Sequence, residues 1–402
     1  MSDNRPAPRY LPWLILAAAI VINLTMGFNY SWSVIKKAMV NDWHWTNVEA
    51  AFPYTVYSIV YAISMFFAGR AQDKFGPRRV ASFGSLVLAV GMLTCGYADS
   101  PLTMAFGYGL LVAVGFSMCY ATTIPTSVKW FAPAKKGVVT GIVLGALGLA
   151  AVYMAPLANW LLAIRGIPAV FLILGLGAAV TIFLIAQLLR NPPAPAVHPA
   201  AAAVPATAEL VWRQTLKTAT FRKLWVMFLF LSSAGQMIFA HMATIAKTQA
   251  TWEGGFYLVI LLALCNTGGR MAGGALSDRF GRIAILKAVF FFFTLNLAFF
   301  PAYDTPGLLS LGAAVTGLCY GACMALFPLL TCDYYGVKNL GANYGILFTA
   351  WGCSGLLGPL YAGWAADVTG SYVIAYYLSA ALLLVSLALA FTVRPPQTCD
   401  AS

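Results

Sequence analysis

Long apolar runs dominate this sequence, and they limit the folds it can adopt more than any other feature. Twelve runs, each long enough to cross a bilayer as a helix of about 20 residues, follow one another along the chain. They cover residues 11–35, 49–70, 79–98, 101–124, 137–160, 167–189, 222–246, 254–275, 283–302, 306–330, 341–363 and 371–393. In lipid, every backbone polar group needs a partner within the protein. The sequence therefore predicts an all-α membrane protein with twelve transmembrane helices.

Lysine and arginine predict how the helices are oriented. With both termini in the cytoplasm, 19 of these residues fall on the cytoplasmic side and 4 on the outer side, and positive charge favours the cytoplasm. The chain has 24 of them, and the remaining one is Arg270, inside the eighth run. The net charge of +12 thus reflects orientation in a lipid bilayer, and no nucleic-acid partner is needed to explain it.

A segment rich in proline and alanine divides the chain. We predict an N-terminal six-helix half over 1–190, a cytoplasmic linker over 191–221 and a C-terminal six-helix half over 222–402. The evidence for this division is the abrupt change in composition between the linker and the apolar runs on either side.

The two halves repeat the same motifs in the same order. The motif GRAQDKFG at Gly69 matches GALSDRFG at Gly274, and GVVTGI at Gly137 matches GANYGI at Gly341. Repeats of this kind indicate two pseudo-symmetric halves related by duplication, which places a binding site between them near the middle of the membrane.

These motifs resemble the signature loops of the major facilitator superfamily. Within it, the stretches GFNYSW and KWFAPAKKGVVTGIVLGALG, together with the arginine of the eighth run, resemble the monocarboxylate transporters and the oxalate/formate antiporters. The resemblance implies the major facilitator fold, both termini in the cytoplasm, and residence in a bacterial inner membrane. It also implies that the paired loops latch the outward-facing state, through Asp73, Arg78, Asp278 and Arg282. The alternative is that these charges only determine topology.

Arg270 needs an explanation, because an arginine at the centre of a membrane helix costs roughly 2.5–3.5 kcal/mol. All twelve acidic residues fall in loops, in tails or at helix ends, so no buried carboxylate is expected to pair with it. Snorkelling, donation to backbone carbonyls and plain packing are alternatives. With the predicted orientation, the eighth helix runs from the outer side to the cytoplasm. Because side chains tilt toward the helix N-terminus, Arg270 points away from the cytoplasmic face and toward the bundle centre. A guanidinium matches a carboxylate with two parallel hydrogen bonds, so we predict one small monocarboxylate anion as its partner.

Several residues are candidates to complete the site. Asn266, one turn before Arg270, can orient the guanidinium or bond the carboxylate. Tyr120, Tyr320 and Tyr30 offer a ring and a hydroxyl, and Phe348 and Leu24 could form an apolar wall, although packing against protein or lipid would explain each equally well. Such a site suits lactate, pyruvate or acetate. The antiporters it resembles add a lysine in the eleventh helix where this sequence has Trp351, which argues against a dicarboxylate.

Proton coupling requires a group other than arginine, which does not deprotonate in proteins. The monocarboxylate transporters that the chain resembles have an acid four residues before the arginine and a lysine in helix 1, whereas this chain has Asn266 and Val34. His241 is the one side chain of the predicted bundle that titrates near neutral pH, so it is the proton-coupling candidate. The alternative for His241 is a hydrogen-bonded packing role.

The function predicted from these residues is secondary transport of short monocarboxylates together with a proton. Anion exchange of the oxalate/formate type is the second possibility, and a non-transporting carboxylate receptor is the third. The eight cysteines form no CxxC pair, and the runs contain no carboxylate pair or nucleophile–base pair. We therefore expect no metal, no cofactor and no enzymatic activity.

Overall fold

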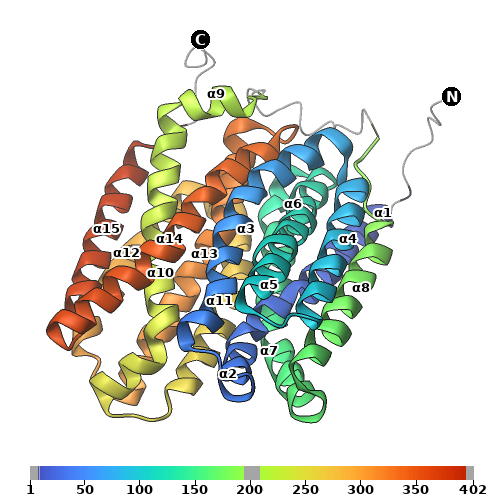
Figure 1. The fold of residues 1–402 in the computed structure, drawn as a ribbon. Helices are drawn as coiled ribbons and strands as arrows, with labels where there is room; N and C mark the ends of the chain where they lie inside the picture. Colours follow the sequence, from blue (N-terminus) through green and yellow to red (C-terminus); the bar gives the residue numbers. More distant parts are fainter. Residues whose placement is uncertain (1–7, 9, 194–208, 395–402) are drawn as a thin grey trace.

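The computed structural model describes residues 8, 10–193 and 209–394, and in this part of the chain it contains helices and connecting turns but no strand (Figure 1). The part of the predicted linker at 194–208 lies outside the described residues. Before it come α1 (Leu11–Thr25), α2 (Trp32–Asp42), α3 (Asn47–Phe75), α4 (Pro77–Gly96), α5 (Pro101–Met104), α6 (Ala113–Lys129), α7 (Lys136–Ala169) and α8 (Leu176–Ala186). After it come α9 (Trp212–Lys217), α10 (Ala219–Ala250), α11 (Gly255–Phe280), α12 (Arg282–Phe299), α13 (Pro306–Tyr335), α14 (Leu340–Thr369) and α15 (Val373–Thr392).

Eleven segments of the described chain are long and apolar enough to cross a membrane, rather than the twelve predicted. The difference lies in Pro133–Ala186, which counts as one segment of 54 residues. At 1.5 Å per residue it would measure about 80 Å, more than twice the thickness of a bilayer core. Gly166 lies inside it with a left-handed φ of 75°, which only glycine adopts readily, so the helix breaks there. The fifth and sixth predicted runs lie on either side of this break.

The first predicted run is also interrupted. The helix runs to Asp42, beyond the predicted end at residue 35, and Met26–Ser31 form a 3-10 turn between α1 and α2. At Gly27 the chain lies so close to Ala150 of α7 that a Cβ would collide with it. The tighter turn places Asn29 where its side-chain oxygen accepts a hydrogen bond from the Tyr108 hydroxyl at 3.1 Å.

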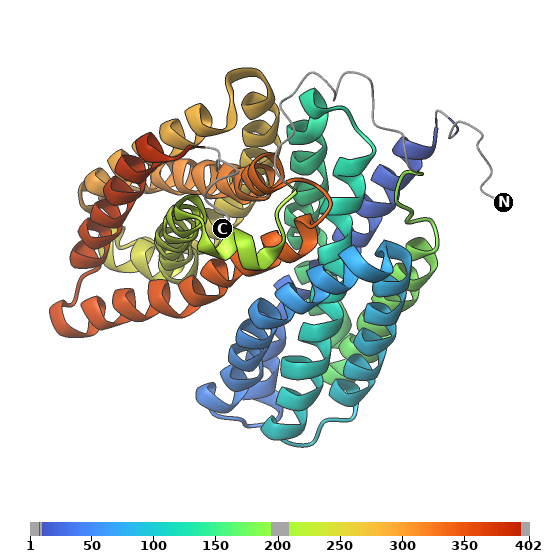
Figure 2. The same cartoon turned by 90° about the horizontal axis from the view of Figure 1, so that it is seen from above.

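Seen from above, the helices before and after the linker form two groups that lie side by side (Figure 2). The groups meet where α3 packs on α14 and where α7 packs on α11. Paired glycines allow this close approach: a Cβ on Gly69 would collide with the carbonyl of Gly341, and a Cβ on Gly137 with that of Gly274. The glycines of the repeated motifs therefore bring the two halves into direct backbone contact.

The end of α15 and the start of α10 lie at the same end of the molecule as α9. Lys223, near the start of α10, donates a hydrogen bond to the carbonyl of Thr392 at 3.0 Å. We call this the α9 end, and Asp73 and Asp278 also lie there.

Candidate functional site

Arg270 lies on α11 in the contact between the halves, and only 6% of it is exposed. Its Nε donates to Oδ1 of Asn266 at 3.4 Å, and its Nη1 donates to the carbonyl of Leu144 on α7 at 3.0 Å. Donation to a backbone carbonyl is therefore observed, whereas snorkelling toward the α9 end is not. A guanidinium has five N–H donors. Within the described chain Nη2 donates to no protein acceptor, and no carboxylate forms an ion pair with Arg270.

Glycines bring the neighbouring helices to Arg270. A Cβ on Gly269 would collide with the carbonyl of Leu318 on α13, and a Cβ on Gly141 of α7 would meet the carbonyl of Arg270 at 2.7 Å. Small residues at these positions let backbones approach in a membrane bundle. The arginine is thus enclosed by α7 from one half and α13 from the other.

Four buried tyrosines, Tyr61, Tyr120, Tyr320 and Tyr344, each contact Phe348 or Trp351 of α14. They come from α3, α6, α13 and α14, so each half contributes two. Tyr120 and Tyr320 are among the site residues predicted from the sequence. Tyr61 and Tyr344 were missed, because one tyrosine among nineteen carries no sequence signal that separates a site residue from a packing residue.

Phe348 forms the centre of an aromatic cluster that joins the halves. Its ring centroid lies 5.7 Å from that of Tyr61 and 6.1 Å from that of Tyr120, both in the N-terminal half. Within its own helix it stacks on Trp351 at 4.9 Å. Because Phe348 is buried among these rings, it does not face lipid.

Tyr320 is held in place by two neighbours. Its hydroxyl accepts a hydrogen bond from Nε1 of Trp351 at 2.9 Å. Its ring covers Gly235 of α10, where any Cβ would collide with it. The hydroxyl keeps its own hydrogen for donation to another acceptor.

Tyr30 and Leu24 differ in their relation to this cluster. Tyr30, in the 3-10 turn after α1, is 36% exposed. Leu24 is half-buried, and its carbonyl accepts a hydrogen bond from the Tyr153 hydroxyl at 2.7 Å. This hydrogen bond holds the backbone of Leu24 against α7.

His241 lies apart from Arg270, on α10. Its Nε2 is 3.3 Å from the carbonyl oxygen of Pro359, and its Nδ1 is 3.2 Å from the Tyr372 hydroxyl. Both ring nitrogens thus have uncharged partners within the C-terminal half. This geometry fits the packing alternative. In the described chain, neither ring nitrogen forms an ion pair.

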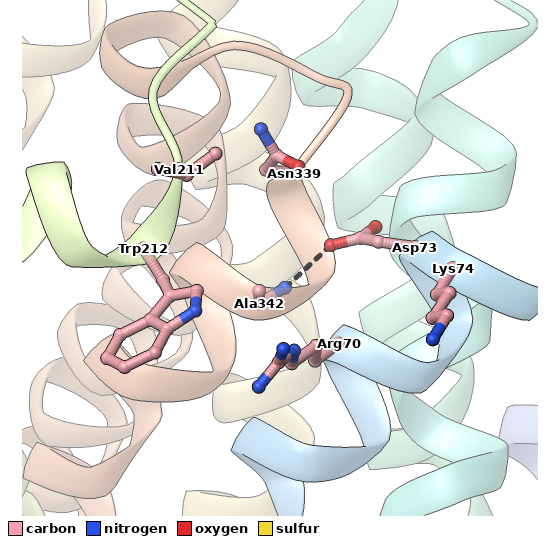
Figure 3. Close-up of a pocket in the computed structure, with 7 residues that line it drawn as sticks. All are labelled: Arg70, Asp73, Lys74, Val211, Trp212, Asn339 and Ala342. Carbon is pink, nitrogen blue, oxygen red and sulfur yellow. Dashed lines mark hydrogen bonds between the residues drawn. The ribbon is translucent and has the colours of Figure 1, made fainter.

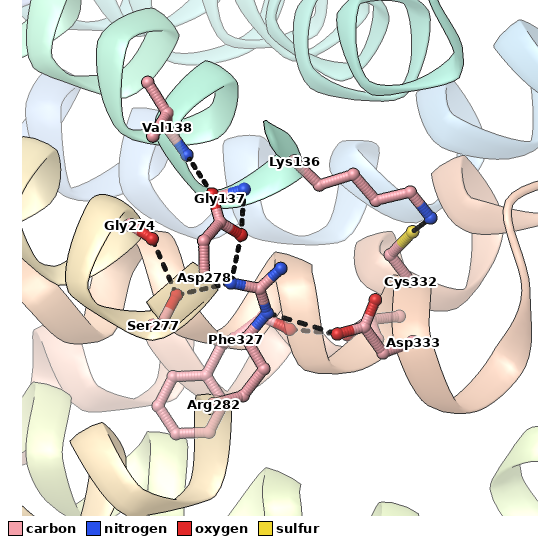
Figure 4. Close-up of polar contacts among 11 residues, drawn as sticks. Lys136, Gly137, Val138, Gly274, Ser277, Asp278, Arg282, Phe327, Cys332 and Asp333 are labelled. Carbon is pink, nitrogen blue, oxygen red and sulfur yellow. Dashed lines mark hydrogen bonds and ion pairs between the residues drawn. The ribbon is translucent and has the colours of Figure 1, made fainter. Parts of the chain in front are cut away.

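Asp278, in the second copy of the repeated loop, joins the two halves at the α9 end (Figure 4). Its two carboxylate oxygens accept hydrogen bonds from the backbone N–H groups of Gly137 and Val138, each at 2.9 Å, in the first turn of α7. Arg282 pairs with Asp278 at 2.6 Å and with Asp333 at 3.2 Å. The carboxylate therefore meets both the positive end of a helix dipole and a guanidinium.

Asp73 makes the corresponding contact from the other half (Figure 3). Its carboxylate accepts from the N–H of Ala342 at 2.8 Å and from that of Gly341 at 3.2 Å, at the start of α14. Arg78 does not take part, because its Nε donates to Oε1 of Gln187 at 2.8 Å within the N-terminal half. Three of the four predicted latch residues thus lie where the halves meet, and Arg78 does not.

Residues of the predicted linker also pack against helices of both halves at the α9 end. Trp212 of α9 packs edge-on against Phe66 of α3 at 5.3 Å, while the carboxylate of Glu209 accepts from the N–H of Lys338 at 2.9 Å. Trp212 also borders a cavity of about 270 Å³ (Figure 3), which is lined by Arg70, Asp73, Lys74, Val211, Trp212, Asn339 and Ala342. Residues 209–217 therefore bridge α3 and the turn before α14.

The two groups of helices with a buried cation where they meet define a multi-pass membrane carrier. The chain belongs to the Major Facilitator Superfamily, whose family profile matches residues 16–303 and 285–398. It is 26% identical over 387 residues to the oxalate:formate antiporter of Oxalobacter formigenes, covering 95% of this chain and 91% of that protein. It is 26% identical over 322 residues to monocarboxylate transporter 13 of Bos taurus, covering 78% of this chain and 72% of that protein.

A solved structure shares the fold. The transporter FucP in its outward conformation superposes with a TM-score of 0.74 at 15% identity, covering 95% of this chain and 99% of FucP. The chain is therefore an integral membrane carrier with the major facilitator fold, and the family to which it belongs consists of transporters and not of enzymes.

Proposed function

We propose that this chain is a secondary active transporter of short monocarboxylates such as lactate or pyruvate, which it moves together with a proton by alternating access. The observation that carries the proposal is Arg270, a cation that is 6% exposed and forms no ion pair in the described chain. A monocarboxylate would neutralise it, and the free Nη2 could donate to that carboxylate. The relatives named above, one for oxalate and formate and one for monocarboxylates, support the same substrate class.

The roles of the surrounding residues follow from their places. Asn266 orients the guanidinium, Tyr120, Tyr320 and Tyr30 surround the substrate with hydroxyls, and Phe348 supplies an apolar wall. Leu24 would contribute to the same wall.

We propose twelve membrane crossings, with the break at Gly166 separating the fifth from the sixth, and both termini in the cytoplasm of a bacterium. Residues 1–190 and 222–402 would be the two moving halves. The α9 end is then cytoplasmic, and the contacts of Asp73 and Asp278 close it, so the structure would represent the outward-facing state with Asp73, Asp278 and Arg282 as its latch.

The proton site we propose is His241. A protonated imidazole could donate to Pro359 while the Tyr372 hydroxyl turns to accept from the other nitrogen, so both forms fit the same partners. In the described part of the chain, both hydrogen-bond partners of the ring are uncharged.

The deciding experiment is uptake of radiolabelled lactate by proteoliposomes containing the purified full chain, with and without an acidic exterior. The proposal expects uptake that rises as the exterior becomes more acidic. Absence of lactate and pyruvate uptake under every gradient would overturn it.

Exchange of organic anions is the second candidate, favoured by the similarity to the oxalate:formate antiporter. Trp351 argues against oxalate as a substrate. It occupies the position of the antiporters' lysine, and its indole donates to Tyr320 and stacks on Phe348, so this position holds no second cation. A 100-fold excess of oxalate should therefore leave lactate uptake largely intact. Strong competition by oxalate would favour the exchanger. A non-transporting receptor, the third candidate, would bind lactate without any uptake.

A further inference from the structure

A second cavity lies at the α9 end, where the start of α4 meets the segment that follows α8. Its volume is about 580 Å³, and three of the residues around it are arginines, while none is acidic. It is lined by Phe75, Gly76, Pro77, Arg78, Arg79, Leu189, Arg190 and Asn191. All of these residues belong to the N-terminal half, so the cavity is separate from the contacts that join the two halves.

Two of the three arginines are held in place around this cavity. Nε of Arg78 donates to Oε1 of Gln187 at 2.8 Å, and Nε2 of Gln187 donates to Oγ of Ser82 on α4 at 2.8 Å. The carbonyl of Arg190 accepts a hydrogen bond from Nε1 of Trp130 at 2.8 Å. These bonds fix the start of α4 against the end of α8, which gives the cavity a defined shape.

The charges of the arginines remain available to a ligand. A guanidinium has five N–H donors, and Arg78 uses one of them for Gln187. Arg79 and Arg190 are exposed, and the ion pairs of the described chain include none of the three arginines. The cavity therefore offers three cations to an anion.

The C-terminal half does not repeat this arrangement. In the second copy of the repeated loop, the residues that correspond to Arg78 and Arg79 are Ile283 and Ala284. At the junction of α12 and α15, Lys287 lies over the ring of Phe391, with 4.1 Å between Nζ and the ring centroid. The pair of arginines at the start of α4 is thus a feature of the N-terminal half alone.

Apolar helix faces continue from the cavity toward the other end of the molecule. On α4, Phe83, Leu86 and Val90 follow Arg79 at helical spacing, and each is more than half exposed. On α8, which packs against α4, Val180 and Leu184 are also more than half exposed. In a membrane carrier such faces contact acyl chains, so the cavity lies where the apolar surface gives way to charge.

We propose that this cavity binds the phosphate headgroup of an anionic phospholipid, such as cardiolipin or phosphatidylglycerol, whose acyl chains lie along α4 and α8. The planar guanidinium matches phosphate oxygens with paired hydrogen bonds, and basic pockets between transmembrane helices suit such headgroups. A soluble phosphate would satisfy the arginines but would leave the apolar faces uncovered. This inference does not depend on which substrate the chain transports.

Thermal unfolding of the purified full chain in an uncharged detergent provides the test. A ligand that binds only the folded protein raises its melting temperature, and the concentration dependence gives an apparent affinity. Cardiolipin is compared with phosphatidylcholine, which has acyl chains and a phosphate but no net charge, and with glycerol 3-phosphate, which has the phosphate but no chains. We expect cardiolipin to stabilise the protein at the lowest concentration.

Arg79→Gln and Arg190→Gln should each weaken the apparent affinity for cardiolipin about fivefold. Both side chains are exposed, so neither variant should prevent folding, whereas replacing Arg78 would also break its bond to Gln187. Arg222→Gln is the matched control, because it removes an exposed arginine at the α9 end from the other half. The control should keep the wild-type affinity.

Three outcomes would overturn the proposal. Equal stabilisation by cardiolipin and phosphatidylcholine would show that the cavity does not select anionic lipid. Stabilisation by glycerol 3-phosphate at the same concentration as cardiolipin would assign the cavity to a soluble phosphate. An equal loss of affinity in Arg79→Gln, Arg190→Gln and Arg222→Gln would show attraction to the whole charged surface and not to this cavity.

Discussion

At the scale of single residues, the main feature is the positive charge of Arg270, which the fold buries without an ion-pair partner in the described chain. The guanidinium of Arg270 uses Nε and Nη1 for Asn266 and Leu144, which fixes its plane and orientation. The remaining donors point to no acceptor in the described chain. A preorientated fork of this kind favours a planar carboxylate over other anions.

Replacing Arg270 should therefore abolish substrate binding. Removal of one partner from a buried, hydrogen-bonded charge pair costs about 2–5 kcal/mol, so we expect Arg270→Ala to weaken lactate binding by about 30-fold or more. Arg270→Lys should recover only part of this loss, because an ammonium lacks the fork. Binding is measured by competition in membranes, with the exposed Arg222→Ala as control. Near-normal lactate binding by Arg270→Ala would contradict this interpretation.

His241 gives a separate prediction about coupling. If this imidazole takes up the transported proton, His241→Gln should remove the dependence of uptake on external pH while leaving exchange of internal for external lactate largely intact. Glutamine can still bond to Pro359 and Tyr372, so the fold should persist. The measurement is initial uptake at external pH 5.5–7.5, with His44→Gln as control. A variant that keeps the full pH response would show that the proton moves elsewhere.

The sequence allowed one part of this site to be predicted and concealed another. Arg270 stood out because a charge within an apolar run is rare and costly, and Asn266 followed from helical spacing. Tyr61 and Tyr344 could not be selected, because their importance arises only when α3 and α14 meet. The orientation of Arg78 toward Gln187 was equally hidden, since it depends on where α8 ends.

At the scale of helices, backbone geometry explains where the predicted pattern failed. Hydropathy located the apolar runs but not the 3-10 turn at Met26–Ser31, because an apolar segment has the same hydropathy in a 3-10 turn as in an α-helix. It did separate the fifth run from the sixth, and the structure has a non-helical residue, Gly166, between them. A positive φ at a single glycine leaves no trace in hydropathy.

The packing of α3 on α14 yields a prediction about the helix contact itself. Gln72 is fully buried, and neither its Nε2 nor its Oε1 has a partner in the described chain. Each unpaired group costs about 1–3 kcal/mol, which destabilises the closed α9 end. Gln72→Met keeps a similar volume without the amide, so it should favour closure.

Cys332 reports this change, because it is 2% exposed and accepts a hydrogen bond from Lys136 of the opposite half at 3.4 Å. In a background with Cys332 as the only cysteine, Gln72→Met should slow its alkylation by N-ethylmaleimide roughly tenfold. Gln187→Met, which lies away from the contact between the halves, is the control. Faster alkylation in Gln72→Met would show that the amide stabilises closure instead.

At the scale of the whole molecule, the two halves close the α9 end by the same device used twice. Asp73 caps the start of α14, and Asp278 caps the start of α7. Each aspartate comes from one copy of the repeated loop and binds a helix of the other half. The duplication visible in the sequence therefore becomes a pair of equivalent contacts across the interface.

The two contacts should respond in the same direction to the same substitution. Asp73→Asn and Asp278→Asn each remove the negative charge that the helix dipole stabilises, worth about 0.3–2 kcal/mol. Both should open the α9 end and speed alkylation of Cys332, with the larger effect at Asp278 because Arg282 also loses its partner at 2.6 Å. Asp304→Asn, in the turn between α12 and α13 at the opposite end, should have no effect. If only one of the two variants opened this end, closure would depend on a single contact, and the symmetric latch would be wrong.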